Sequence, residues 1–428
     1  MAYVSQFYVF DMHPFHAQVC LAPFDQQVLY DSEYRHLIHL YLHLHPCLIM
    51  DYAAEALRRH REAKGKLSIE GKLPLVTRDD LSVAYTPGVA APCREIAKNP
   101  EEVYAYTIKG NTVAVITDGS AVLGLGNIGA AASLPVMEGK CALFKRFAGI
   151  DAFPIALATQ NVEEIVSAVI AIAPVFGGIN LEDIAAPRCV EIEQRLAAAL
   201  PIPVFHDDQH GTATVVLAGL LNAARVVHKE LAQMKIVISG AGAAGSAIAR
   251  LLHSFGVGDI IVTDSKGIVT SKRGDLGWLK NMLTTFTNKN DACCMLIDAL
   301  KGADAFVGVS KPNVLKPEMI AQMARDPIVF AMANPDPEMM PDEAKAAGAA
   351  VVATGRSDFP NQLNNVLVFP GLFRGVLDGR IKRITQGMMV KAAQALAAFV
   401  PSPTAEKIIP SVFEDGIADA VAKAVRSA

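Results

Sequence analysis

Short apolar runs rich in β-branched residues alternate with helix-like stretches from residue 112 onward. TVAVIT at 112–117 precedes a helical pattern at 162–173, and apolar runs follow within 177–183 and 203–208. Parallel strands that are buried on both faces read as continuous apolar runs, and helices connect them. The pattern therefore predicts parallel βαβ units in this part of the chain.

A second set of apolar runs begins at residue 235. Four or five such strands separated by helices are typical of an open doubly wound sheet of the Rossmann type. After Phe359 the chain becomes an asparagine-bearing loop and then an alanine-rich helical tail. The predicted strands are KIVISG at 235–240, DIIVTD at 259–264, DAFVGVS at 304–310, IVFAMAN at 328–334 and AAVVATG at 349–355.

The pattern as a whole predicts an α/β protein of two domains. We expect a substrate and metal domain at 51–213 and a Rossmann dinucleotide-binding domain at 214–356. The segment 357–428 is expected to return to the first domain, so that the active site lies in the cleft between the two.

Residues 1–50 differ from everything after them, because they contain six of the eleven histidines but no lysine and no glycine. His39 and His43 would share one helix face at i, i+4 spacing, but a metal site also needs oriented and enclosed ligands. We interpret this segment as an atypical N-terminal extension that need not belong to the fold. The change in composition at Met50 suggests the hypothesis that Met50 is the natural start.

Composition excludes several classes of protein. At 428 residues, 52% of them hydrophobic, the chain can bury more than one core. A formal net charge of −4 offers no basic excess for nucleic acid. The seven cysteines lack C-x-x-C spacing, and no run reaches the ~18 apolar residues of a membrane span. We therefore expect a cytoplasmic protein that acts on a small molecule, with neither nucleic acid nor membrane as a partner.

The run KIVISGAGAAGSAIARLL carries the pattern G-x-G-x-x-G directly after an apolar strand and at the start of a helix. Gly240 permits the tight turn, Gly242 lets the backbone approach a pyrophosphate, and Gly245 allows close helix packing. A glycine-rich packing turn is the alternative, but it does not explain the strand, glycines, helix and following acid together. We expect cofactor contacts at Gly240, Gly242, Ala243, Ala244, Gly245, Asp264, Ser265, Lys266, Ser310 and Asn334.

The sequence leaves the choice between NAD and NADP open. Asp264 ends the strand that follows the glycine turn, where its carboxylate could accept the ribose hydroxyls. That charge would repel a 2′-phosphate, whereas Ser265, Lys266, Lys272 and Arg273 could attract one.

Acidic residues gather at the ends of three predicted strands. They are Asp118 in VITDGS, Glu182 and Asp183 in INLEDI, and Asp207 and Asp208 in VFHDDQHGT. Side chains alternate across a strand, so one acid of each pair can ligate while its neighbour bonds elsewhere. Hard oxygen donors suit Mg²⁺ or Mn²⁺. Ordinary acidic turns are the alternative for either pair alone.

Two further candidates are Tyr85 in VAYTPGVA and Lys140 in MEGKCALF. Burial would lower the pKa of a lysine and fit it for proton transfer. For Tyr85 or Lys140 considered alone, a structural role is the simpler interpretation.

These segments, in this order, resemble the malic enzyme family over roughly residues 51–428, and its compact bacterial and archaeal type most closely. Nine matches in the same order are more specific than any one motif. The matching stretches are AYTPGVA, TDGSAVLGLGNIG, MEGKC, NLEDI, HDDQHGTA, GAGAAGSAIA, TDSKGIV, FAMANPDPE and ATGRSDFPNQLNNVLVFPG.

The resemblance implies the roles of particular residues. It implies a catalytic Lys140 and Tyr85, with Asp207 in the proton-transfer network. It implies metal ligands at Glu182, Asp183 and Asp208, and substrate contacts at Asn334 and at Asn364 or Asn365. It also implies a homodimer or higher homo-oligomer.

The implied reaction is the oxidative decarboxylation of (S)-malate to pyruvate and carbon dioxide with reduction of NAD or NADP, through metal-bound oxaloacetate and enolpyruvate. Lys140 would take the hydroxyl proton and return it to the enolate oxygen, and Tyr85 would protonate C3. Longer family members carry a carboxylate-binding arginine where this chain has Ala121. Backbone N–H groups of GLGNIG or Arg94 are the candidates to replace it.

Two other functions stay open at this point. One is a dehydrogenase for an amino acid or hydroxy acid that needs neither metal nor decarboxylation. The other is an inactive dinucleotide-binding sensor, which the presence of Tyr85, Lys140 and the acids argues against.

Overall fold

The computed structural model describes residues 51–428, and residues 51–64 and 65–428 fall into different compact units. Helix α2 (Tyr52–Ala63) belongs to the first unit, and its N-cap Asp51 accepts hydrogen bonds from two backbone N–H groups. The histidine cluster and Met50 lie outside the described residues.

The first sheet has four parallel strands in the order β2-β1-β3-β4. Alternate residues of β1 enter different cores. Ala114 and Ile116 pack with helices α7 and α8, whereas Val113 and Val115 pack with α6 and α15. The bounds are β1 (Thr112–Thr117), β2 (Asp151–Ala156), β3 (Gly178–Leu181), β4 (Val204–His206), α6 (Ala130–Ala148), α7 (Val162–Ile172), α8 (Arg188–Ala199) and α15 (Phe369–Asp378).

The second sheet has six strands in the order β10-β9-β8-β5-β6-β7, all parallel except the short β7. Ile236 and Ile238 of β5 share a core with α9 and α10, and Val237 points to the core with α12, α13 and α14. The bounds are β5 (Lys235–Ser239), β6 (Asp259–Asp264), β7 (Gly267–Ile268), β8 (Ala305–Gly308), β9 (Ile328–Ala331), β10 (Val351–Thr354), α9 (Thr212–Val226), α10 (Ala243–Phe255), α11 (Trp278–Leu283), α12 (Leu296–Leu300), α13 (Pro317–Ile320) and α14 (Pro341–Ala346).

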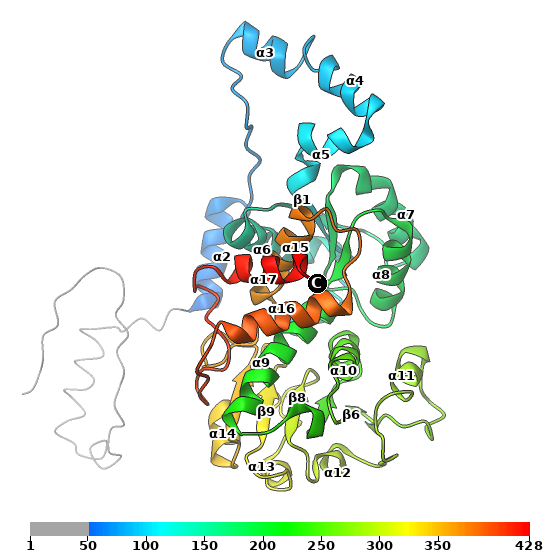
Figure 1. The fold of residues 1–428 in the computed structure, drawn as a ribbon, viewed down its shortest axis with the longest axis vertical. Helices are drawn as coiled ribbons and strands as arrows, with labels where there is room; N and C mark the ends of the chain where they lie inside the picture. Colours follow the sequence, from blue (N-terminus) through cyan, green and yellow to red (C-terminus); the bar gives the residue numbers. More distant parts are fainter. Residues whose placement is uncertain (1–50) are drawn as a thin grey trace, which may run out of the picture. The chain divides into compact units, whose positions relative to one another are not determined.

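The last helices of the chain pack back on earlier elements (Figure 1). Helix α16 (Gln386–Ala398) packs against α9, and α17 (Ile417–Arg426) packs against α15 and α16. Helix α15 also contacts α6 of the first sheet, and it is preceded by the short helix η8 (Asn365–Leu367).

Residues 73–107 carry helices without a core of their own. They form α3 (Arg78–Ala84), α4 (Ala90–Lys98), η2 (Pro100–Glu102) and α5 (Val103–Tyr106), drawn in blue and cyan in Figure 1. Within the described chain, none of these helices contains a buried residue.

The prediction of an α/β protein with a Rossmann-type sheet is confirmed. Every predicted strand is present close to its predicted bounds, and β6 matches 259–264. Strand β2 was not predicted because Pro154 and Asp151 interrupt its apolar pattern. Among residues 51–428, no helix combines the length and the apolar composition that a membrane crossing requires.

Candidate active site

The acids that end the strands of the first sheet meet at one edge. Asp118 follows β1, Glu182 and Asp183 follow β3, and the π-helical turn η6 (Asp207–Gly211) follows β4. Strand β2 lies on the other side of β1, so the chain reverses its winding direction between β1 and β3. Ligands of open parallel sheets bind in the crevice at such a reversal.

Lys140 lies on α6 with its ammonium group among these acids. Its Nζ is 2.5 Å from Asp207 Oδ2 and 2.8 Å from Glu182 Oε1, and it stands 4.2 Å from the ring centroid of Phe369. The side chain of Lys140 is 7% exposed and that of Asp207 is fully buried. The structure therefore brings together Lys140, Asp207 and Glu182, which lie far apart in the sequence.

Several carboxylate oxygens of the cluster are engaged and others are not. Glu182 uses one oxygen for Lys140 and accepts a 2.9 Å hydrogen bond from Asn180 with the other. The N–H of Asp183 donates to Asp208 Oδ2 at 2.8 Å. Within the described residues, Asp183 Oδ2 and Asp207 Oδ1 are buried and accept no hydrogen bond. Two carboxylate oxygens at the strand ends are thus available to a ligand.

Burial and mutual repulsion raise the pKa values of these acids. Burial raises the pKa of Glu182 and of Asp207 to about 7, although Lys140 lowers both. Burial also raises the pKa of Asp208 to about 6, and burial with the charges of Asp208 and Glu182 raises that of Asp183 to about 9.

The pKa of Lys140 differs in direction from the expectation for a buried lysine. Burial alone acts to lower it, as predicted, but the carboxylates of Asp207 and Glu182 outweigh burial and hold the pKa above its usual value. Lys140 is therefore an ammonium group in the resting protein.

The donor chemistry of the site fits a hard divalent cation. Asp183, Asp208 and Glu182 supply only oxygen atoms, and the unpartnered buried oxygen of Asp183 favours a cation nearby. Within residues 51–428, however, no three His, Cys, Asp or Glu side chains converge as a ready-made ligand set. Each oxygen of Glu182 already faces Lys140 or Asn180, so an ion bound by Glu182 would share an oxygen with one of these partners or displace it.

A buried polar network that sequence reasoning missed supports the turn η6. Glu193 of α8 accepts from the His206 N–H at 2.9 Å and from Gln209 Nε2 at 3.1 Å, and lies 2.9 Å from His210 Nε2. Arg250 of α10 donates to Gln209 Oε1 at 3.2 Å. Helix α10 of the second sheet's core is therefore linked to the turn that carries Asp207 and Asp208.

The glycine turn after β5 has the geometry that its pattern predicts. Gly240 has φ +119°, and a Cβ there would lie 2.5 Å from the Val309 carbonyl oxygen. A Cβ at Gly245 would lie 1.8 Å from the Gly240 oxygen, so a side chain does not fit. A Cβ at Gly242 would meet no atom of the protein, so packing does not require this glycine. Approach of a ligand to the N-terminus of α10 explains it better.

The other predicted cofactor contacts lie around this turn. Ala243 and Ala244 begin α10, and Ser310 Oγ lies 3.0 Å from the Oγ of Ser239, the last residue of β5. The N–H of Ser310 donates to Glu338 Oε1 at 2.8 Å. Glu338 is buried and was not predicted, since nothing in the local sequence NPDPEMM distinguishes it.

Asp264 is surrounded by cations. Its oxygens accept from Arg273 at 2.8 and 3.1 Å and from Lys280 at 2.5 Å, and the Lys266 N–H donates to it at 2.9 Å. Burial raises the pKa of Asp264, but Arg273 and Lys280 outweigh burial and lower it to about 2. Lys272 pairs with Asp291 instead.

The predicted substrate asparagines lie on two loops. Asn334 follows β9, and a Cβ at Gly124 would lie 2.6 Å from its carbonyl oxygen, so this loop meets the loop after β1. The Asn364 side chain caps η8, and Asn365 Cβ lies 3.1 Å from the position of a Cβ at Gly211, beside Asp207. Asn365 is thus close to the acid cluster.

Tyr85 and Arg94 lie elsewhere in the structure. Tyr85 ends α3 with 66% of its surface exposed, and Arg94 is exposed on α4. The arginine that lies near Ala121 is Arg188. Its guanidinium donates to Ser120 Oγ at 3.0 Å and to Asp118 Oδ2 at 3.1 Å.

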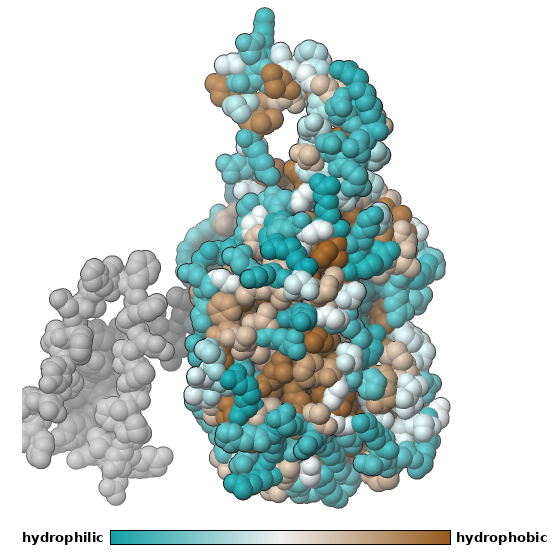
Figure 2. All heavy atoms as spheres, in the orientation of Figure 1, coloured by the Kyte–Doolittle hydropathy of each residue, from teal (hydrophilic) through white to brown (hydrophobic). Residues whose placement is uncertain are grey.

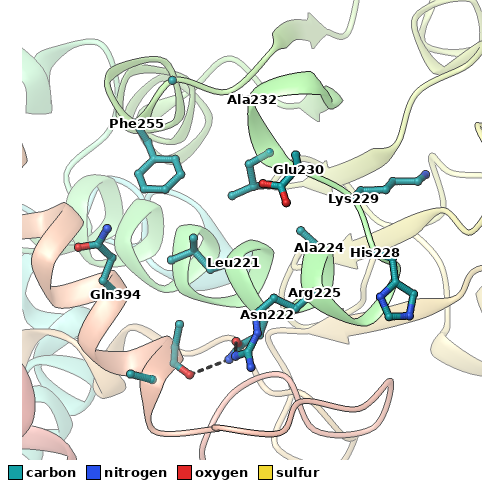
Figure 3. A pocket seen from close by; sticks show the side chains of 14 residues that line it. Leu221, Asn222, Ala224, Arg225, His228, Lys229, Glu230, Ala232, Phe255 and Gln394 are labelled. Carbon is teal, nitrogen blue, oxygen red and sulfur yellow. Dashed lines mark hydrogen bonds between the residues drawn. The ribbon is translucent and has the colours of Figure 1, made fainter.

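A separate hollow lies between the C-terminal ends of α9 and α10 and helix α16 (Figure 3). Asn222 donates to the carbonyl oxygens of Ala397 and Ile408, and Arg225 donates to Asn222 Oδ1 and the Pro401 oxygen. These polar groups are satisfied by the protein itself, and the predicted site residues do not line the hollow.

Comparison with protein families assigns both halves of the chain. Residues 64–197 match the malic enzyme N-terminal domain, and residues 209–427 match the malic enzyme NAD-binding domain. The chain is 53% identical to the bifunctional malic/malolactic enzyme of Bacillus subtilis, covering 89% of this chain and 93% of the relative. It is 48% identical to the NADP-dependent malic enzyme of Halomonas elongata, covering 86% of each.

Solved structures agree with this assignment. The NAD-dependent malic enzyme of Thermotoga maritima superposes with a TM-score of 0.85 at 48% identity, covering 87% of this chain and 98% of that one. The malic enzyme of Pyrococcus horikoshii superposes with a TM-score of 0.83, also at 48% identity, covering 86% and 90%.

Proposed function

This chain belongs to the malic enzyme family, and we propose that it oxidises (S)-malate with NAD or NADP and releases carbon dioxide to leave pyruvate. The observation that carries the proposal is the buried Lys140, held between Asp207 and Glu182 at the strand ends of the first sheet. A positive group enclosed by acids, in a domain linked by α10 to a dinucleotide turn, suits proton transfer next to a hydride acceptor.

Lys140 and Asp207 together would move the proton of the malate hydroxyl. Because Lys140 is an ammonium group at rest, it can accept that proton only as it gives one up, and Asp207 Oδ2 lies 2.5 Å away to receive it. The hydride leaves C2 for the nicotinamide. In the later enolate stage, the ammonium group can return a proton to the same oxygen.

Glu182, Asp183 and Asp208 would hold a divalent cation of the Mg²⁺ or Mn²⁺ type. Such an ion withdraws electrons from the substrate oxygens and so stabilises the charge that develops as carbon dioxide leaves. The protein's own part is to keep Glu182 and Asp183 buried next to Lys140, where little water competes for them, and to hold the partly exposed Asp208 beside Asp183.

The decarboxylating reaction is favoured over a simple dehydrogenase because this cluster contains more acids than proton transfer requires. Hydride transfer to a nicotinamide does not itself develop an enolate, whereas loss of carbon dioxide does, and a divalent ion would stabilise that charge. Arg188 and the backbone N–H groups of the loop after β1 are the groups of this chain best placed to meet a substrate carboxylate.

The test compares Lys140→Met with Lys145→Met. Both lysines are on α6, but the side chain of Lys145 is 63% exposed and pairs with Asp151. We expect Lys140→Met to lose at least ~10²-fold in malate turnover, the usual range for a lost general acid–base group, with Lys145→Met unchanged. Circular dichroism checks that both variants fold. Parental turnover in folded Lys140→Met would exclude the proposed role.

A further inference from the structure

Two consecutive cysteines, Cys293 and Cys294, lie in the loop between α11 and α12, and both are exposed. Their Sγ atoms are 2.9 Å apart, close enough for one thiol to donate a hydrogen bond to the other. Consecutive side chains of an extended strand point in opposite directions. Cys294 instead has a φ of +86°, in the left-handed region, which lets the two sulfurs meet. The loop therefore presents two adjacent thiols to solvent, named the thiol pair here.

The backbone around the thiol pair is held by hydrogen bonds. The buried Asn288 side chain donates to the Ala292 oxygen at 2.9 Å and accepts from the Ala292 N–H at 2.8 Å. The Cys294 oxygen accepts from the Ile268 N–H at 2.9 Å. Because Ala292 and Cys294 are both held, the thiols stay together. Once one sulfur has reacted, the other is present at a high effective concentration.

The thiol pair is connected to the strand beside Asp264. In the antiparallel pairing of β6 with β7, Gly267 lies opposite Asp264. A Cβ at Gly267 would overlap the Cys294 oxygen, so the backbone of the loop packs directly on β7. A change in the direction of the Cys294 carbonyl group therefore acts on the residues that pair with Asp264.

The surroundings of the thiol pair are polar. Asp291, two residues earlier, pairs with Lys272 and accepts a 2.7 Å hydrogen bond from Thr270 Oγ1. Figure 2 shows a mostly hydrophilic surface over the end of the molecule that carries α12 and α13. A water-soluble reagent can therefore reach both exposed sulfurs.

We propose that Cys293 and Cys294 are a reversible oxidation site, at which the thiol pair closes to one disulfide and weakens dinucleotide binding at the Asp264 end of the site. The reacting partner is a small disulfide of the oxidised glutathione type. The effect on the dinucleotide rests on the proposed function, whereas the oxidation does not. The new ring contains the peptide bond between the cysteines, so its closure changes the torsions of Cys294 and turns its carbonyl group away from Ile268.

The oxidation proceeds by two thiol–disulfide exchanges. The thiolate of one cysteine attacks a sulfur of the small disulfide, whose S–S bond breaks, and one small thiol leaves. The thiolate of the other cysteine then attacks the cysteine sulfur of the mixed disulfide, and the second small thiol leaves. Two electrons pass from the thiol pair to the small disulfide, and the two thiol protons end on the two small thiols.

A disulfide between consecutive cysteines suits a switch better than a permanent crosslink. Their Cα atoms are only about 3.8 Å apart across a trans peptide bond, which is below the usual range of roughly 4.4–6.8 Å for a disulfide. Such a deviation makes the bond easier to reduce. Under reducing conditions permanent disulfides are rare, whereas redox-sensing ones form transiently. Small thiols should therefore reopen the thiol pair readily.

The first measurement is mass spectrometry of the peptide that carries the thiol pair. Folded protein is treated with oxidised glutathione, alkylated with iodoacetamide and digested with trypsin. Cleavage after Lys289 and Lys301 releases residues 290–301, which contain these two cysteines and no other. We expect this peptide to lose two hydrogen atoms and take up no alkyl group, and to take up two alkyl groups after dithiothreitol. A peptide that keeps two free thiols, or that carries glutathione instead, would overturn the proposal.

Cys293→Ser and Cys294→Ser are the matched variants, since each keeps one exposed thiol in the same loop. Both should stop at the mixed disulfide with glutathione. Cys93→Ser removes an exposed thiol elsewhere and should leave closure unchanged. Loss of closure in Cys93→Ser, or closure that persists in either matched variant, would show that other sulfurs react.

The second measurement is fluorescence titration with the reduced dinucleotides. We expect the Kd of the oxidised parental protein to be about three- to tenfold higher than that of the reduced protein, the scale of one lost hydrogen bond, and dithiothreitol should restore it. The double variant Cys293→Ser/Cys294→Ser should give the same Kd under both conditions.

The two measurements separate the two claims. An unchanged Kd in protein whose disulfide is proven by mass would overturn the connection to the dinucleotide site. Reduced parental protein that binds neither dinucleotide would refute the proposed function, while the peptide masses still decide the oxidation.

Discussion

The interaction free energy of the ion pair between Lys140 and Asp207 can be measured. At 2.5 Å, Coulomb's law with an effective dielectric constant of about 20 gives roughly 6–7 kcal/mol of attraction. Removing both charges from water costs several kcal/mol for each ion, which offsets much of this attraction. Removing one partner leaves the other buried and unpaired, and typically costs about 3–5 kcal/mol.

We therefore predict strong coupling in a double-mutant cycle. Lys140→Met and Asp207→Asn should each lower the free energy of unfolding by about 3–5 kcal/mol, and the double variant should lose at least ~2 kcal/mol less than their sum. The assay is urea unfolding in EDTA, followed by circular dichroism. Lys145 and Asp151 on the surface are the control pair, with an expected coupling below about 1 kcal/mol.

Additive losses at Lys140 and Asp207, within about 0.5 kcal/mol, would contradict this reasoning. The two groups would then not form a buried pair in solution. The proton relay proposed for them would lose its geometric basis.

Four further predictions concern the cofactor turn and the acids. Asp264→Asn should raise the ratio of kcat/KM for NADP to that for NAD by about tenfold, as expected for one charge-assisted hydrogen bond, and equal ratios in steady-state assays would reject this. Burial raises the pKa of Asp264, but Arg273 and Lys280 lower it from 3.8 to about 2. The parental protein should therefore resist urea unfolding better than Asp264→Asn above about pH 4, and this difference should disappear between pH 4 and 2. Gly245→Ala should abolish dinucleotide binding by fluorescence titration, since its Cβ would overlap the Gly240 oxygen, while Gly274→Ala, with open space around its Cβ, should bind normally. Mn²⁺ should raise the Tm of the parental protein by several degrees and that of Asp183→Asn by much less, and equal shifts in scanning calorimetry would remove Asp183 from the proposed ligands.

The fold could be predicted from sequence where one kind of periodicity dominates. Most strands of both sheets are buried on both faces, so each appears as a short, largely apolar run, such as DIIVTD for β6. Strand β2 is only partly buried, and its polar Asp151 and Pro154 conceal it. The exposure of residues 73–107 could not be foreseen either, because sequence alone does not distinguish an exposed Leu81 or Val83 from a buried one.

The candidate site was predicted as separate motifs, not as contacts. The glycine spacing predicted the turn because Gly240 and Gly245 each answer a local steric demand, and Gly242 leaves space in front of the helix N-terminus. The pairing of Lys140 with Asp207 joins residues 67 positions apart, and only tertiary structure creates it. The pKa of Lys140 was expected to fall because its apolar neighbours in the sequence predict burial. The sequence does not predict that the carboxylates of Asp207 and Glu182 face the ammonium group, and these raise the pKa. Glu193 could have been found, since it shares the apolar face of α8 with Cys189, Ile192 and Leu196.

The most direct test of the central claim is reduction of the dinucleotide by the parental protein. L-malate, Mn²⁺ and either NAD or NADP are supplied, the reduced-nicotinamide absorbance is followed, and pyruvate, oxaloacetate and lactate are assayed at the end. One pyruvate for each dinucleotide reduced is the predicted result. Reduction with oxaloacetate as the end product, or no reduction with either cofactor, would contradict it.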